Sequence, residues 1–113
     1  MAVPPRDAAR LRHIEAASER VALYTAGGHE SLTDARTLDA VLHCLAVIGE
    51  AVGTLSEGTY AKLTSLPPGA PISMRNLIVH EYWRVDPVVV WTTVARDIPS
   101  LLRDVRAVLE RDA

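Results

Sequence analysis

Apolar side chains recur every three or four residues through most of this chain, and this spacing restricts its fold more than any other feature. An α-helix has about 3.6 residues per turn, so the spacing brings apolar side chains onto one face. Regular alternation of apolar and polar residues, which is typical of a half-buried β-strand, does not occur. Residues 88–90 form the only strand-like run, and they directly follow a helix-start signal. The sequence therefore predicts an all-α fold.

Residues that start and stop helices divide this pattern into four main helices and one short helix. Proline near the start and glycine just past the end favour a helix, as do Ser, Thr or Asp caps. The expected helices cover residues 6–24, a cap at 31–34 leading to about 57, residues 59–65, residues 72–83, and a last helix from 87 to about 111. Pro99 should kink the last helix. With 113 residues, we expect one domain over 1–113, folded as an up-and-down bundle.

Composition and charge exclude several classes of protein. Apolar residues make up 49% of the chain and charged residues 23%, which is typical of globular proteins rather than disordered ones. No stretch approaches the roughly 20 apolar residues of a membrane helix, and no secretion signal is seen, so we expect a cytoplasmic protein. The formal charge of −2 gives no general attraction to nucleic acid, so any RNA contact would need a local cluster of cations.

Metal and disulfide chemistry are not expected. Cys44 is the only cysteine, which excludes an internal disulfide and a cysteine-based zinc site within one chain. His13, His29 and His43 show no metal-ligand spacing with one another or with His80. We therefore predict no metal site and no cofactor.

Reactive side chains are most concentrated in the segment from Met74 to Trp83. At about 100° per residue, one helical face would pack. The other face would carry Arg75, Asn76, Val79, His80 and Trp83. His80 can exchange protons near neutral pH, and Arg75 can stabilise the charge that develops on a phosphodiester. These two groups could act together on a bound phosphodiester, and that chemistry needs no metal.

Val79 and Trp83 lie in the middle of this polar face. An exposed tryptophan beside a valine is more naturally a contact between two chains. A two-fold homodimer would place two sets of Arg75 and His80 side by side and form a cleft between them.

The pattern of Arg75, four residues, His80, one residue and Tyr82 resembles the R-x4-H-x-Y motif of the HEPN-domain toxins called HepT. Asn76 is the polar residue expected just after the arginine. The resemblance also covers residues 37–41, residues 48–51, the loop leading to residues 74–76, and the stretch from 85–86 to 97–99, so it spans nearly the whole chain in order. The chain departs from many of these proteins in the loop at residues 66–71, where Pro-Gly-Ala-Pro replaces a turn that contains tryptophan.

The resemblance implies a HEPN-type helical homodimer that acts as a metal-independent endoribonuclease. It implies catalytic roles for Arg75 and His80 and a supporting role for Asn76. It further implies the toxin of a type VII toxin–antitoxin pair. The partner would be an MNT-type nucleotidyltransferase antitoxin that attaches AMP to Tyr82.

Other interpretations remain open on the residues alone. Arg75 and His80 could be surface residues that pair with Glu81, and Tyr82 could be a packed core residue. Glu50 could orient the site or make an interhelical hydrogen bond. The alternative function is a non-catalytic, nucleotide-binding or partner-binding regulatory subunit of a nucleotidyltransferase, which would use the same Arg75 and Tyr82.

Overall fold

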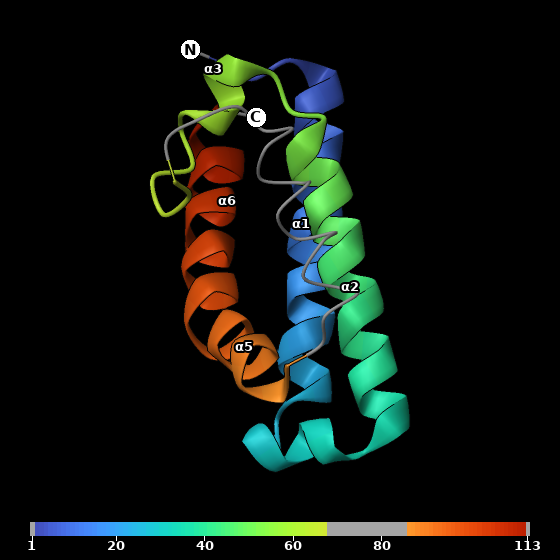
Figure 1. The fold of residues 1–113 in the computed structure, drawn as a ribbon. Helices are drawn as coiled ribbons and strands as arrows, with labels where there is room; N and C mark the ends of the chain where they lie inside the picture. The colour runs from blue at the N-terminus through green and yellow to red at the C-terminus, as the bar shows by residue number, and fades with distance from the viewer. Residues whose placement is uncertain (1, 68–85, 113) are drawn as a thin grey trace.

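A computed structural model describes residues 2–67 and 86–112 of the chain, and these residues are almost entirely helical (Figure 1). The elements in chain order are α1 (Pro5–Tyr24), the 3-10 helix η1 (His29–Thr33), α2 (Ala35–Gly53), the short α3 (Glu57–Tyr60), α5 (Pro87–Thr92), the π-helical turn η2 (Thr93–Asp97) and α6 (Ile98–Asp112). No strand occurs in these two ranges. The all-α prediction is confirmed, while the helix expected at 72–83 lies outside the described residues.

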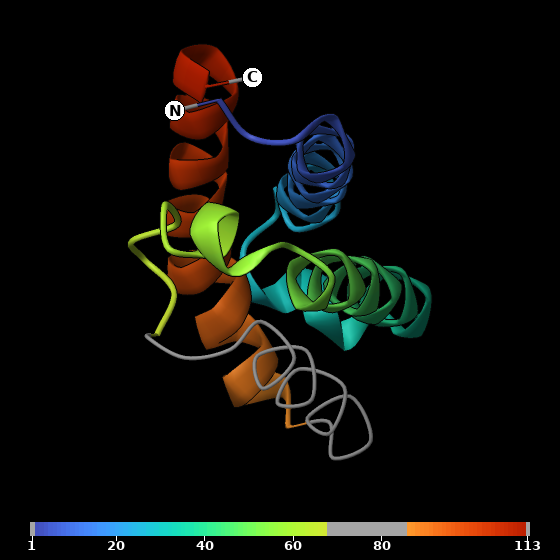
Figure 2. The ribbon, with the colours of Figure 1, turned by 90° about the horizontal axis from the view of Figure 1, so that it is seen from above.

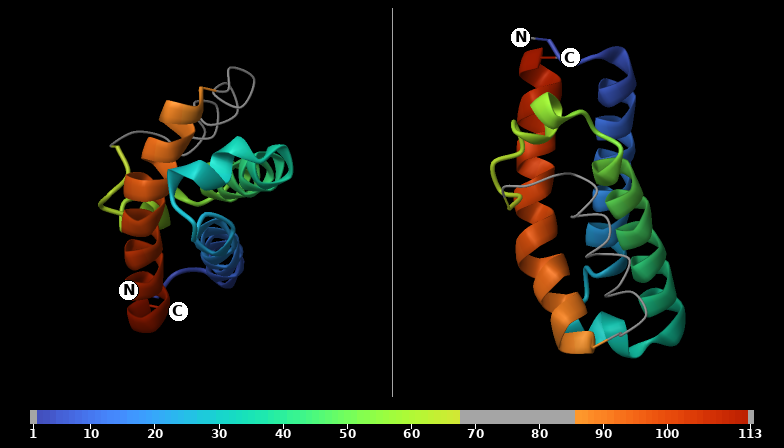
Figure 3. Two further views of the ribbon diagram at one scale, coloured as in Figure 1. Left: turned by 90° about the horizontal axis from the view of Figure 1, so that it is seen from below. Right: turned by 45° about the horizontal axis from the view of Figure 1, so that its top comes forward.

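The long helices lie side by side and run up and down. Seen from above, α1 lies between α2 and α6, and each of the two packs against it (Figure 2). The chain descends α1, returns through α2, and ascends again from α5 through η2 into α6 (Figures 1 and 3). Both ends of the described chain meet at one end of the bundle, where the Val3 N–H donates to the Asp112 carbonyl over 2.9 Å.

The core is built from the apolar stripes predicted by the sequence. Helix α1 buries Leu11, Ile14 and Val21, and these side chains recur at three- and seven-residue steps. The other helices complete the core with Val41, Ile48, Val52, Val105 and Val108. Burial of each side chain of this size stabilises the fold by roughly 1.5–3 kcal/mol.

Local signals place the start of α2. Gly28 has φ of 85°, a value that glycine adopts without strain, and it turns the chain out of α1. Asp34 caps α2 by accepting hydrogen bonds from the Thr37 N–H at 2.9 Å and the Thr37 hydroxyl at 2.8 Å. Ser31 does not take part in this cap, because it belongs to the 3-10 helix η1, which the sequence analysis did not predict.

The expected end of the second helix and the position of the short helix were wrong. α2 ends at Gly53 instead of about Glu57, and α3 spans Glu57–Tyr60 instead of 59–65. Ser56 provides the reason, because its hydroxyl accepts from the Thr59 N–H and starts a new helix.

The last helix is continuous but changes its hydrogen-bonding pattern just before Pro99. The Ile98 N–H bonds to the Thr93 carbonyl five residues earlier, which defines the π turn. Proline lacks an N–H and its ring would crowd the carbonyl four residues before it, so the wider turn makes room for the ring. The prediction of one helix interrupted at Pro99 is confirmed in this form.

Candidate functional site

The residues predicted to form the site lie outside the described residues. This holds for Arg75, Asn76, Val79, His80, Tyr82 and Trp83. The described residues instead show how the chain is held on either side of this segment, and they reveal a groove and a buried polar cluster elsewhere in the bundle.

On the N-terminal side, the chain is fixed as far as Pro67. The Tyr60 hydroxyl donates to the Pro67 carbonyl over 2.6 Å. Two residues earlier, the Ser65 N–H donates to the Asp104 carboxylate of α6 over 2.7 Å. Burial raises the pKa of Tyr60, which keeps its hydroxyl protonated as the donor in this bond. The loop that precedes the motif is therefore held against α6 up to this point.

On the C-terminal side, Asp86 begins α5. Its carboxylate accepts from the Val88 N–H over 2.9 Å, and Pro87 occupies the first helical position. This is the cap predicted from the sequence. The Trp91 ring of α5 meets the His29 ring of η1 edge to face, with centroids 6.1 Å apart. These contacts fix the start of the last helix at the end of the bundle where α1 turns into α2.

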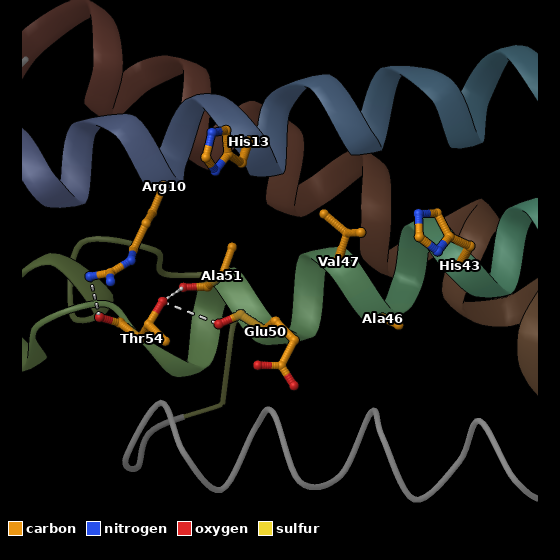
Figure 4. Close-up of a pocket in the computed structure, with 8 residues that line it drawn as sticks. All are labelled: Arg10, His13, His43, Ala46, Val47, Glu50, Ala51 and Thr54. Carbon is orange, nitrogen blue, oxygen red and sulfur yellow. Dashed lines mark hydrogen bonds between the residues drawn. The ribbon is translucent and has the colours of Figure 1, made fainter.

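A shallow groove of about 400 Å³ runs between α1 and α2 (Figure 4). It is lined by Arg10, His13, His43, Ala46, Val47, Glu50, Ala51 and Thr54. The Arg10 guanidinium donates to the Thr54 carbonyl over 3.0 Å, so a cation caps the C-terminal end of α2. Figure 4 shows the Glu50 carboxylate directed away from α1.

Charge is divided between the two flanks of α1. Glu15 and Glu19 lie on the flank toward α6, where both pair with Arg106 at 3.4 and 3.3 Å. The other flank carries Arg6, Arg10, His13 and Arg20, which helical spacing places within about 80° of one another. No acidic side chain of α1 shares this second flank, and two of its members, Arg10 and His13, line the groove.

A buried acidic cluster was missed by the sequence analysis. The Asp7 side chain is only 3% exposed. It accepts hydrogen bonds from the Ser56 hydroxyl at 2.5 Å, the Thr59 hydroxyl at 2.6 Å and the Ser56 N–H at 3.4 Å. Asp7 falls on the same stripe as Leu11 and Ile14, and this position was the signal that could have revealed it. The cluster ties the start of α1 to α3.

Burial of the Asp7 carboxylate disfavours its charged form. The hydrogen bonds from Ser56 and Thr59, with the nearby charge of Arg10, outweigh this effect and lower the pKa of Asp7 below its ordinary value of 3.8. Asp7 is therefore a charged anchor that needs its three donors. This arrangement provides structural support, because the Ser56 and Thr59 hydroxyls are engaged as donors to the carboxylate that they anchor.

Cys44 is buried in the core, which agrees with its interpretation as a small apolar residue. His13, His29 and His43 are exposed. Within residues 2–67 and 86–112, no three His, Cys, Asp or Glu side chains come together as a metal site would require, and no helix is long and apolar enough to cross a membrane.

Comparisons with known proteins agree with the motif. The model of the family described as Ribonuclease HepT-like matches residues 12–108. The chain is 37% identical over 70 residues to "Probable ribonuclease HepT" of Thermococcus cleftensis, a match over 62% of this chain and 64% of that protein. It is 32% identical over 73 residues to a "Putative RNase" of Caldanaerobacter subterraneus subsp. tengcongensis, covering 65% of each.

A "Putative RNase" of Methanocaldococcus jannaschii is 29% identical over 69 residues, which cover 61% of this chain and 63% of that protein. The chain spans less than two thirds of the length of each of these three relatives. No solved structure matches it. Because the family model covers residues 12–108, which include Arg75, His80 and Tyr82, this all-α chain belongs to the HepT-like ribonuclease family.

Proposed function

We propose that the chain is a metal-independent endoribonuclease whose reactive groups are Arg75 and His80. The observation that carries this proposal is the family match across residues 12–108, which contains the complete R-x4-H-x-Y pattern. The described residues on either side of that segment are ordered by local contacts, the Tyr60 bond to the Pro67 carbonyl before it and the Asp86 cap of α5 after it.

In the proposed reaction, the ribose 2′-hydroxyl attacks the adjacent phosphorus and the bond from phosphorus to the 5′-oxygen breaks. His80 acts as the base that takes the 2′-hydroxyl proton, or as the acid that protonates the leaving 5′-oxygen. Arg75 binds the phosphate and stabilises its extra charge in the transition state, and Asn76 positions the RNA backbone. The products are a 2′,3′-cyclic phosphate, which can open to a 3′-phosphate, and a 5′-hydroxyl.

The experiment is RNA cleavage with EDTA present, comparing the wild type with His80→Ala and Arg75→Ala. Arg12→Ala is the control, because Arg12 is an exposed cation of α1 that does not line the groove. We expect each site variant to lose at least about 100-fold in rate, since a lost transition-state contact costs several kcal/mol. Full activity in His80→Ala would remove His80 from the mechanism. A wild type that binds RNA but never cuts it would favour the regulatory-subunit alternative.

We further propose that the chain is the toxin of a type VII pair and that an MNT-type nucleotidyltransferase neutralises it. Support comes from the same family match and from the Tyr82 position of the motif. Expression without the partner should arrest bacterial growth, and His80→Ala should relieve the arrest while leaving the circular dichroism spectrum unchanged. An equally toxic His80→Ala protein would show that toxicity does not come from RNA cleavage.

A further inference from the structure

Some cations of the described residues pair with carboxylates, and others, which include Arg12, Arg36 and Arg103 besides those near the groove, do not. On the last helix, Arg96, Arg106 and Arg111 pair with neighbouring carboxylates. On the groove-side flank of α1, neither Arg6, His13 nor Arg20 forms an ion pair with any described residue. The chain as a whole has a formal charge of −2, so this flank is a local concentration of positive charge on a slightly acidic protein.

The length and shape of this flank suit an extended polyanion. Arg6 and Arg20 are separated by about 21 Å along the axis, at the helical rise of about 1.5 Å per residue. On the α2 side, the adjoining groove is lined by the small apolar residues Ala46, Val47 and Ala51, together with His43, Glu50 and Thr54. Glu50 is the acidic residue among them, and Figure 4 shows its carboxylate directed away from α1 and its cations.

We propose that this flank of α1, formed by Arg6, Arg10, His13 and Arg20, binds the phosphate backbone of an RNA strand along the α1–α2 groove. The inference rests on the proposed ribonuclease function, and it adds a substrate-binding surface separate from the R-x4-H-x-Y segment. Among the described residues that line the groove there is no Phe, Tyr or Trp for stacking on bases, and the only rings are the imidazoles of His13 and His43. Binding should therefore come mainly from phosphate contacts and depend little on RNA sequence. Arg10 is partly engaged with the Thr54 carbonyl, and the outer arginines carry most of the contact.

The test measures binding to a single-stranded RNA in which every ribose is 2′-O-methylated, which removes the attacking hydroxyl and prevents cleavage. Fluorescence anisotropy gives the dissociation constant at several salt concentrations. The test variant is Arg6→Gln/Arg20→Gln. The matched control is Arg12→Gln/Arg103→Gln, which removes the same charge from exposed positions away from the groove. Arg10 is left intact because its guanidinium also caps the C-terminal end of α2 at the Thr54 carbonyl.

We expect the test variant to bind roughly ten- to thirty-fold more weakly at 0.1 M salt. The slope of log K against log salt should fall by about 1.4, since each phosphate contact on a single strand contributes about 0.7. The control should keep the wild-type slope. An equal loss in both variants, or an unchanged slope in the test variant, would overturn the inference.

Two further outcomes separate this inference from the proposed activity and from a protein partner. If the wild type binds the methylated RNA with the expected difference but never cuts unmodified RNA, the groove inference is supported and the ribonuclease proposal fails. If Arg6→Gln/Arg20→Gln keeps its RNA affinity but no longer co-purifies with a co-expressed nucleotidyltransferase, the flank contacts protein and the RNA assignment is wrong.

Discussion

Asp7 is a charged residue that works as part of the core. It lies on the buried stripe of α1, yet its carboxylate stays ionised because two hydroxyls and one N–H of the α3 turn donate to it. Removing one partner from such a buried cluster leaves the others unsatisfied, which costs more than the bond itself is worth. Asp7 thus stabilises the contact between the start of α1 and α3.

Asp7→Asn should lower the free energy of unfolding by roughly 1–3 kcal/mol, because the amide nitrogen cannot accept from the Ser56 and Thr59 hydroxyls. The pKa of Asp7 is lowered in the folded state, so its contribution is complete above the unfolded value near 3.8 and is lost as pH falls through the folded value. Thermal unfolding at pH 7 and at pH 3 measures both effects. Asp39→Asn, at an exposed position of α2, is the control. A difference between wild type and Asp7→Asn that grows on acidification would contradict this account.

Tyr82 is the residue at which we expect covalent control. On the sequence, it lies seven positions from Arg75 and so nearly in line with it on a helix. Attached AMP would place phosphate charge within reach of the guanidinium and compete with RNA. Co-expression with an MNT-type nucleotidyltransferase should raise the intact mass by multiples of an AMP group, and Tyr82→Phe should abolish the increase. Tyr24→Phe, at the exposed end of α1, should not. Modification of another residue would rule out Tyr82 as the control point.

At the scale of elements, the sequence predicted helix starts better than helix ends. Asp34 and Asp86 are caps in the structure, because a short carboxylate just before a helix can accept hydrogen bonds from the free N–H groups of its first turn. The end of α2 was misplaced, because apolar spacing continues through Leu55 while the chain already turns at Thr54. The π turn could not be predicted either, since Pro99 indicates a disturbance without saying which hydrogen-bonding pattern relieves it.

The candidate site was predictable only as far as its motif. The pattern formed by Arg75, His80 and Tyr82 indicates the family, and the family match confirms this family assignment. The Asp7 cluster and the groove could not be predicted from the sequence, because both form between helices that become neighbours only in the folded bundle. Arg10 and Thr54 are 44 residues apart, and Asp7 and Thr59 are 52 apart, so their contacts follow from the packed bundle and not from local spacing.

Helix α5, the first part of the last helix, should depend strongly on its Asp86 cap. It has only six residues, and Val88 and Val89 remain exposed. Asp86→Ala should therefore speed amide hydrogen exchange in residues 88–92 by roughly five-fold, which corresponds to a lost cap of about 1 kcal/mol. Mass spectrometry of exchange measures this. Asp97→Ala, at an exposed aspartate of η2, is the control. An equal change throughout α1 would mean that the cap affects the whole bundle.

At the scale of the whole molecule, the two-fold homodimer is a prediction from Val79 and Trp83. A buried tryptophan pair at a symmetric interface cannot accept a carboxylate without a large desolvation cost. Trp83→Glu should therefore elute as a monomer while retaining its helical spectrum. Val88→Glu changes an exposed valine of α5 in the same way and should leave the assembly unaltered. Light scattering coupled to size-exclusion chromatography gives the mass. A dimeric Trp83→Glu protein with unchanged dissociation would place the interface elsewhere.

The hydrogen bond between the Val3 N–H and the Asp112 carbonyl makes the described chain almost a closed ring. Lys62 holds the same end together through its 3.0 Å ion pair with Asp112. A short peptide linker could join residues 3 and 112 with little loss of entropy, because their separation is already small. New ends could then be opened at the exposed turn around Gly27 and Gly28. In such a circular permutant, α6 and α1 would become consecutive helices of one hairpin, while every contact of the core stayed the same.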